Sequence, residues 1–148
     1  MALGQGTEPR SGLMSPSLAS KIEAANSALR VDGHLDAVAE FLASDHVTHL
    51  TNEDVTGGHE AIRRELGMYR RAFGDLAVDV EILMVGEDCV AWQRTLRATR
   101  QGSFNGFPAT GRPIEWRDMV VSRFGDGLIA EDWLVTDLAE RLLLARQS

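Results

Sequence analysis

Two aspartates and two tryptophans near the C-terminus are of the types and spacing that acid–base chemistry requires. Trp116 and Asp118 form one group, and Trp133 and Asp137 form another about twenty residues later. A carboxyl group that is buried among apolar rings can accept a proton and return it near neutral pH. We therefore predict Asp137 as a general acid–base residue, and the alternative is that it caps a following helix.

A β-hairpin is the element that must position these four residues. The pair Asp126-Gly127 lies between two alternating runs, which favours a type I′ turn because both central residues need positive φ. The resulting register groups six residues on one face: Trp116, Asp118, Val120, Trp133, Val135 and Asp137. It places Asp132 on the other face. A bulge would shift the register by one residue and exchange the faces of one strand.

Several of these side chains are candidates for substrate binding, each with a structural alternative. An unpaired carboxylate at Asp118 is costly on an inward face, so we expect it to be protonated, to line a wet pocket, or to pair with an arginine such as Arg94. Trp92, Trp116 and Trp133 offer flat walls to a fused-ring ligand. Core packing explains three tryptophans equally well.

Two histidines form a second candidate group. His46 and His49 lie on a short predicted strand over residues 46–50, where a neutral imidazole could orient a substrate carbonyl group. A structural role is the alternative. No two histidines have the spacing and carboxylate neighbours of a metal site, so no metal is expected. The glycine-rich residues 102–111 join two strands and lead into no helix, which argues against a phosphate-binding loop.

Length and composition indicate one domain with a small-molecule partner. The chain has 148 residues, of which 44% are hydrophobic, and this suffices for a single core. We predict a flexible leader over residues 1–15 and one domain over residues 16–148. The net charge of -7 argues against nucleic acid and anionic membrane surfaces as partners.

Cysteine usage and hydropathy indicate the compartment. Cys89 is the single cysteine, so no internal disulfide can form, which fits a reducing cytoplasm. No signal-like segment is present, and no run approaches the ~18 apolar residues of a membrane span. We therefore expect a soluble cytoplasmic protein.

Hydrophobic periodicity predicts helices first and strands later. Helical spacing of apolar residues predicts a helix from residue 16 to Asp32, a short helix over residues 35–43 and a third helix that starts near Gly58. Alternation predicts strands over residues 76–84 and 89–100, followed by the hairpin and a closing helix over residues 138–146. This segregation gives an α+β fold, in which a strongly curved, mostly antiparallel sheet packs on the N-terminal helices. A cavity between the sheet and the helices would suit an apolar or aromatic small molecule.

Five short signatures in a fixed order resemble the SnoaL-like polyketide cyclase family, of the nuclear transport factor 2 fold superfamily. They are GHEAI at residues 58–62, AFGDL at 72–76, GFPATGR at 106–112, RFGDG at 123–127, and EDW at 131–133 followed by Asp137. The resemblance spans residues 35–143. It implies a cone-shaped α+β barrel, commonly homodimeric, that closes polyketide rings by intramolecular aldol condensation in antibiotic biosynthesis.

The resemblance also implies roles for particular residues and the absence of a metal or organic cofactor. The family's acid–base aspartate at the end of the last strand matches Asp137. Where family members often have Thr-His-x-Gly, this chain has Arg100 in place of the histidine, and Arg100 could contact an anionic or oxygen-rich substrate. Together with the residue patterns, the expected substrate-binding set is the following: Trp116, Asp118, Trp133, Trp92, His49 and Arg100.

Two other functions remain open on the sequence. An epoxide hydrolase of the same fold would use aspartates and an arginine to activate water, but its Arg-x-Asp pattern before the glycine-rich loop is absent here. The same fold also serves as a non-catalytic module for small-ligand binding or dimerisation.

Overall fold

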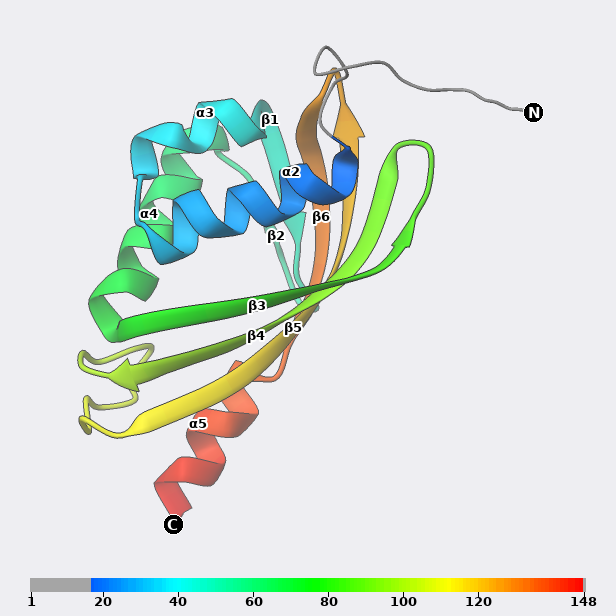
Figure 1. Ribbon diagram of the computed structural model, residues 1–148. Helices are drawn as coiled ribbons and strands as arrows, with labels where there is room; N and C mark the ends of the chain where they lie inside the picture. The colour runs from blue at the N-terminus through cyan, green and yellow to red at the C-terminus, as the bar shows by residue number, and fades with distance from the viewer. Residues whose placement is uncertain (1–16, 148) are drawn as a thin grey trace.

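The computed structural model describes residues 17–147 (Figure 1). The predicted leader, residues 1–15, lies outside the described residues. The helices are α2 (Leu18–Ala25), which continues as a π-helical segment (Asn26–Val31), a short 3-10 turn (Leu35–Ala37), α3 (Val38–Phe41), α4 (Gly58–Ala72) and α5 (Leu138–Gln147). None of the helices within this described part is long and apolar enough to span a membrane.

Six strands form one sheet in the order β2-β1-β6-β5-β4-β3. Their bounds are β1 (Leu42–His49), β2 (Asp54–Val55), β3 (Phe73–Val85), β4 (Cys89–Arg100), β5 (Pro113–Gly125) and β6 (Leu128–Thr136). All neighbouring strands are antiparallel except β1 and β6, which are parallel. The predicted α+β fold with a curved, mostly antiparallel sheet is confirmed, and the sheet stays open, with β2 and β3 at its edges. Figure 1 shows α2 and α4 on one side of the sheet and α5 at its far end.

Alternating side chains fix which face of the sheet is buried. In β4, every second residue from Val90 to Arg100 is buried, as the period of two along the strand requires. Trp92 and Arg94 therefore both lie on the buried face of this strand. In α4, the stripe that contains Ile62 and Leu66 is buried, so the helix packs its apolar side on the sheet.

The first helix widens before it ends. The amide of Asp32 donates to the carbonyl of Ser27 over 2.9 Å, an i to i−5 bond of the π-helical kind. The sequence predicts one continuous helix here and gives no indication of the change. The π-helical segment contributes two polar side chains, Asn26 and Arg30, to a cavity that also has lining residues on the sheet.

The apolar core has two parts. The first lies between α2, α4 and the strands β4 to β6, and it includes Ile22, Leu66 and Trp92. The second lies beside α5, where the rings of Phe73 and Trp116 are 4.8 Å apart between centroids. Because Trp116 is only 2% exposed and packs in the second part, it stabilises the far end of the sheet.

The hairpin turn forms as predicted. Asp126 and Gly127 have φ of 52° and 81°, the two positive values of a type I′ turn. Phe124 pairs with Ile129 across it.

Beyond the Phe124–Ile129 pair, the predicted register is wrong. Arg123 pairs with Glu131 rather than with Ala130, so Ala130 is an additional residue in β6, and this is a β-bulge. The pairing of every later residue shifts by one, so that Val120 pairs with Leu134 and Asp118 with Thr136. Because side chains alternate along a strand, the bulge exchanges the faces of β6.

Because the bulge exchanges the faces of β6, the predicted grouping of residues on its two faces is wrong. Trp133 and Val135 turn away from the helices and are 42% and 63% exposed. Asp132 and Leu134, which were expected on the outer face, line the cavity instead. The hairpin therefore places Asp118 on the same face of the sheet as Asp132, and not on the face of Asp137.

Candidate active site

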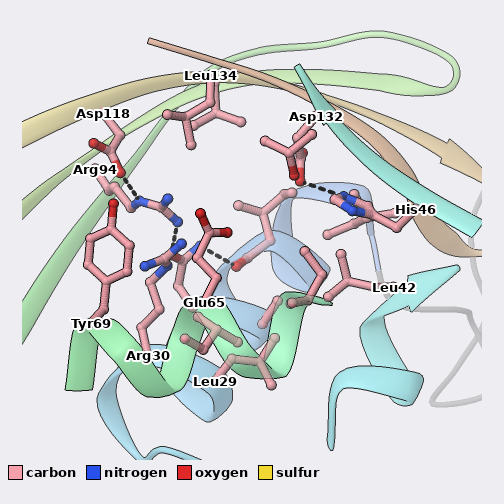
Figure 2. A pocket seen from close by; sticks show the side chains of 18 of the residues that line it. Leu29, Arg30, Leu42, His46, Glu65, Tyr69, Arg94, Asp118, Asp132 and Leu134 are labelled. Carbon is pink, nitrogen blue, oxygen red and sulfur yellow. Dashed lines mark hydrogen bonds and ion pairs between the residues drawn. The ribbon is translucent and has the colours of Figure 1, made fainter. Parts of the chain in front are cut away.

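A cavity of about 180 Å³ lies between the inner face of the sheet and the helices (Figure 2). A cavity of this order admits an aromatic ring. Its walls are mainly aliphatic: Ile22, Leu29, Leu42, Ile62, Leu66, Val120, Ile129 and Leu134. Two polar clusters interrupt these walls, and Figure 2 shows them on opposite sides of the cavity.

The first cluster is centred on Asp132 and draws on four strands. His46 of β1 lies with Nε2 2.9 Å from Asp132 Oδ2. The hydroxyl of Ser122, on β5, donates to Asp132 Oδ1. The indole N–H of Trp92, on β4, donates to Ser122 Oγ over 2.9 Å. The side chain of His46 is 1% exposed and that of Asp132 is 18% exposed.

Hydrogen-bonding capacity fixes the direction of this chain. An indole nitrogen can only donate, so Ser122 accepts from Trp92 and uses its own proton for Asp132. An ionised Asp132 can only accept, which assigns the proton of a neutral His46 to Nε2. The Nδ1 atom of His46 is then an acceptor, and it has no partner among residues 17–147.

This arrangement suits proton transfer. Donors on two sides hold the carboxylate of Asp132 in one orientation, and the residue lines the cavity. Such fixed orientation is what general acid–base catalysis requires of the group that handles the proton. The cluster offers a carboxylate to a ligand in a cavity whose walls are mainly aliphatic.

The second cluster is centred on a buried ion pair. Arg94 Nε donates to Asp118 Oδ2 over 2.8 Å, and the side chains are 6% and 7% exposed. Arg94 Nη1 donates to Asn26 Oδ1 over 2.9 Å, and the guanidinium lies 5.1 Å from the ring of Trp92. The sequence leaves Asp118 either paired with Arg94 or lining a pocket, and the structure shows both.

Arg30 and Tyr69 complete the second cluster. The guanidinium of Arg30 lies over the ring of Tyr69, 5.7 Å from its centroid. Burial, and then the nearby positive charge of Arg94, lower the pKa of Arg30 to about 10. Burial likewise raises the pKa of Tyr69, because it disfavours the phenolate. Both groups therefore lie in a poorly hydrated part of the cavity.

Asp137, the predicted acid–base residue, lies outside the cavity at the start of α5. Its Oδ1 accepts from the backbone amide of Arg117 over 2.8 Å, and its Oδ2 accepts from Arg141 Nε over 3.1 Å. The side chain is 33% exposed. Its observed contacts connect the end of β6 to β5 and to α5.

The other predicted residues divide between the cavity and the rest of the fold. Trp92 and Asp118 line the cavity. Trp116 packs in the second part of the core. Arg100 donates from Nη2 to the carbonyl of Pro108 over 3.2 Å, so it holds the glycine-rich loop. Trp133 lies on the outer face of the sheet.

His49 also lies on the outer face, in a network of its own. Its Nδ1 is 2.8 Å from Asp54 Oδ1, and its Nε2 is 2.6 Å from Glu131 Oε2. Its ring stacks on Trp133 with 5.1 Å between centroids. The hydrogen bond to Glu131, and then that to Asp54, raise the pKa of His49 above 6.5. The bond to His49, and then that to Arg123, lower the pKa of Glu131 below 4.5.

These shifts predict how stability depends on pH. His49 binds its proton more tightly in the folded state, so its contribution is complete below about pH 6.5 and is lost as pH rises through the folded pKa. Glu131 behaves oppositely, and its contribution is lost as pH falls below 4.5. We expect His49→Gln to flatten the decline in urea midpoint as pH rises above about 6.5. An unchanged slope in the variant would contradict this expectation.

Sequence reasoning missed several residues of the two polar clusters, among them Asp132, Ser122, Tyr69 and Arg30. Asp132 was assigned to the wrong face by the register. Ser122 and Tyr69 carry no distinguishing spacing, and Arg30 lies in a segment whose π-helical geometry was not predicted. His46 was a candidate together with His49, and the structure places only His46 in the cavity. Within residues 17–147, no group of three or more His, Cys, Asp or Glu side chains has the arrangement of a metal site.

Comparison with known proteins places this cavity in context. The family model of the SnoaL-like polyketide cyclases matches residues 21–144. The chain is 29% identical to IdmH of Streptomyces antibioticus, a candidate polyketide cyclase, with a TM-score of 0.72 and coverage of 86% of this chain and 97% of that one. No curated protein matches the chain.

Two further solved structures are similar. AclR of Streptomyces galilaeus, a candidate hydroxylase, is 28% identical with a TM-score of 0.72, covering 88% of this chain and 96% of that one. A candidate polyketide cyclase of Acidithiobacillus ferrooxidans is 22% identical with a TM-score of 0.76, covering 89% and 99%. At that lower identity, the likeness concerns the fold alone.

Proposed function

The chain belongs to the SnoaL-like polyketide cyclase family, and from this premise we propose that it closes a ring in a poly-carbonyl substrate by an intramolecular aldol reaction. Asp132 is the proposed general acid–base residue. The observation that carries the proposal is the position of its carboxylate, which lines an apolar cavity while Ser122 and His46 hold its orientation.

The reaction balances with the residues of this chain alone. The carboxylate of Asp132 removes a proton from a carbon between two carbonyl groups, which leaves an enolate. The enolate carbon attacks another carbonyl carbon of the same molecule, and the new alkoxide takes the proton back from Asp132. The closure is an isomerisation that consumes no oxidant or reductant, so it requires no organic cofactor.

The apolar walls contribute to the same step. They exclude water, which strengthens the electrostatic interactions inside the cavity and protects the enolate from protonation by solvent. They also fold a flexible substrate so that its reacting carbons lie close together, which lowers the entropy cost of closure.

The sequence resemblance assigns this role to a different aspartate, Asp137. Its contacts with the Arg117 amide and with Arg141 support a structural role at the start of α5. The two assignments predict opposite results for the variants Asp132→Asn and Asp137→Asn.

Three other functions predict different products. AclR, described as a candidate hydroxylase, suggests a product that gains one oxygen atom. An epoxide hydrolase would form a diol. Such an enzyme would activate a water molecule with two carboxylates around one arginine. Here Arg94 contacts Asp118, whereas His46 and Ser122 hold Asp132. A non-catalytic module would bind a ligand and release it unchanged.

The experiment that tests the proposal measures proton exchange and ring closure together. Purified protein is incubated in deuterated buffer with a synthetic aromatic ester that carries a poly-β-ketone side chain. We expect deuterium to enter the carbon between the carbonyls faster than in buffer alone, and a cyclic product to form. A product with an added oxygen, a diol from an epoxide probe, or no conversion at all would each favour one of the three other functions.

We also propose that the protein is a homodimer that pairs through the outer face of its sheet. That face carries exposed apolar side chains from β3, β5 and β6: Leu83, Met119, Val121, Trp133 and Val135. A contiguous apolar surface of this kind is typical of an association site, and the family resemblance favours a second copy as the occupant.

Val135→Glu is expected to convert the dimer to a monomer, because it places a charge in the middle of the proposed apolar interface. Sedimentation or light scattering measures the mass directly. Val31→Glu is the matched control, since Val31 is 41% exposed and lies on the helical side, away from the outer face. A dimeric Val135→Glu protein, or a monomeric unmodified protein, would reject this interface.

A further inference from the structure

The second polar cluster holds hydrogen-bond donors that the protein does not use. Arg30 lines the cavity, and its guanidinium makes no hydrogen bond or ion pair with any of residues 17–147; the one contact observed is with the ring of Tyr69. The hydroxyl of Tyr69 likewise has no hydrogen-bond partner in that part of the chain, and it also lines the cavity. Figure 2 shows both side chains rising from the helices toward Arg94.

The charges of this cluster leave Arg30 without a partner of its own. The carboxylate of Asp118 is engaged by Arg94, so that pair is internally neutral. Glu65 also lines the cavity, but no basic group in the described part lies within ion-pair distance of it, and its effect on Arg30 is smaller than that of Asp118. The lowered pKa of Arg30 agrees with a cation that is poorly hydrated and has no counter-charge of its own.

Unused donors around a partly buried cation fit an anionic oxygen. A guanidinium offers paired N–H groups that match the two oxygens of a carboxylate, and it binds an enolate oxygen by the same charge-assisted bonds. The aliphatic walls require that this oxygen be carried on an apolar body. The same cavity contains Asp132, so one molecule could contact both clusters.

We propose that Arg30 and Tyr69 form a subsite for an anionic oxygen of the substrate, either a carboxylate or an ionised enol. The inference rests on the proposed function, because it specifies the substrate class of that same cavity. Arg30 anchors the charged end of the substrate, and the carbon that loses its proton then lies toward Asp132. The substrate is accordingly a poly-carbonyl acid or a readily ionised dicarbonyl compound.

Three probes of similar shape test the subsite by calorimetric titration. They are β-naphthoate, which carries a carboxylate, phenylindandione, which ionises to an enolate, and β-naphthamide, which is neutral. We expect the protein to bind at least one of the two anions roughly 10- to 100-fold more tightly than the amide, the range expected for a charge-assisted pair in a poorly hydrated site. The anion that binds more tightly shows whether the subsite accepts a carboxylate or an ionised enol.

Variants assign the preference to this cluster. Arg30→Gln is expected to remove the preference for the anion while binding of β-naphthamide stays within a few-fold. Glu65→Gln is expected to strengthen anion binding, because it removes a nearby negative charge. Arg112→Gln is the matched control, since Arg112 is exposed and does not line the cavity, and it should change nothing. Tyr69→Phe and Arg30→Lys, which should each lose part of the preference, test the subsite if Arg30→Gln fails to fold.

The outcomes separate this inference from the proposed function. Equal binding of anions and amide, or a preference that survives Arg30→Gln, would overturn the subsite even in an active cyclase. A protein that closes no ring but binds an anion through Arg30 would keep the subsite and lose the cyclase proposal. The titrations need no turnover, so each result stands independently of the assay.

Discussion

Asp132→Asn is expected to lower kcat for ring closure about 100- to 10,000-fold, with little change in KM. This is the range that a positioned general acid–base group contributes. Asparagine keeps the shape of the side chain and can still accept a hydrogen bond from Ser122, but its amide cannot take up the proton. Deuterium exchange at the carbon between the carbonyls should fall by a similar factor, because exchange reports the same proton transfer without the later steps.

Asp137→Asn is the matched control for this variant. Asp137 lies outside the cavity and contacts Arg117 and Arg141, so the expected change in kcat is about three-fold at most, typical of a group that does not touch the reacting atoms. The reverse pattern, an inactive Asp137 variant beside an active Asp132 variant, would return the acid–base role to Asp137. It would also require the hairpin to adopt the register without the bulge in solution.

Local rules predicted the parts of the fold that depend on a few neighbouring residues. The alternation in residues 89–100 gave the correct bounds of β4, because the period of two is decided within the strand. The pair Asp126-Gly127 gave the correct turn, because positive φ at two adjacent positions is a requirement on those residue types alone.

The bulge at Ala130 was not predictable from the turn, and it changed the site. In β6 the apolar residues do not alternate strictly, since Trp133, Leu134 and Val135 follow one another. The register could have been recognised from charge, because the bulged pairing brings Arg123 Nε to 2.9 Å from Glu131 Oε1. Opposite charges that face each other across a strand pair are stabilising, whereas the regular register pairs Arg123 with Ala130.

Contacts between distant segments were beyond local reasoning. His46 and Asp132 are 86 residues apart and meet because β1 pairs in parallel with β6. Nothing in the residues around His46 distinguishes it from His49 three positions later, yet one enters the cavity and the other turns outward. The sequence thus identified the residue types of the site and its fold, while strand pairing decided which of the candidates meet.

Arg94→Met is expected to lower the free energy of unfolding by about 3–5 kcal/mol, the typical cost of leaving a buried charge without its partner. Asp118 already has one carboxylate oxygen, Oδ1, without a partner in the described part of the chain. Removing the guanidinium deprives Oδ2 and the side-chain oxygen of Asn26 of their donors as well. Urea denaturation with an unchanged m-value measures the loss.

Arg97→Met on the same strand is the control, because Arg97 is 50% exposed and its bonds to Asp79 and Glu115 are open to water. Its replacement should cost much less, since solvent hydrates the carboxylates that remain. Adding Asp118→Leu to Arg94→Met should recover most of the lost stability, because the stranded charge is removed together with its partner. If Arg94→Met costs no more than Arg97→Met, the ion pair does not stabilise the fold.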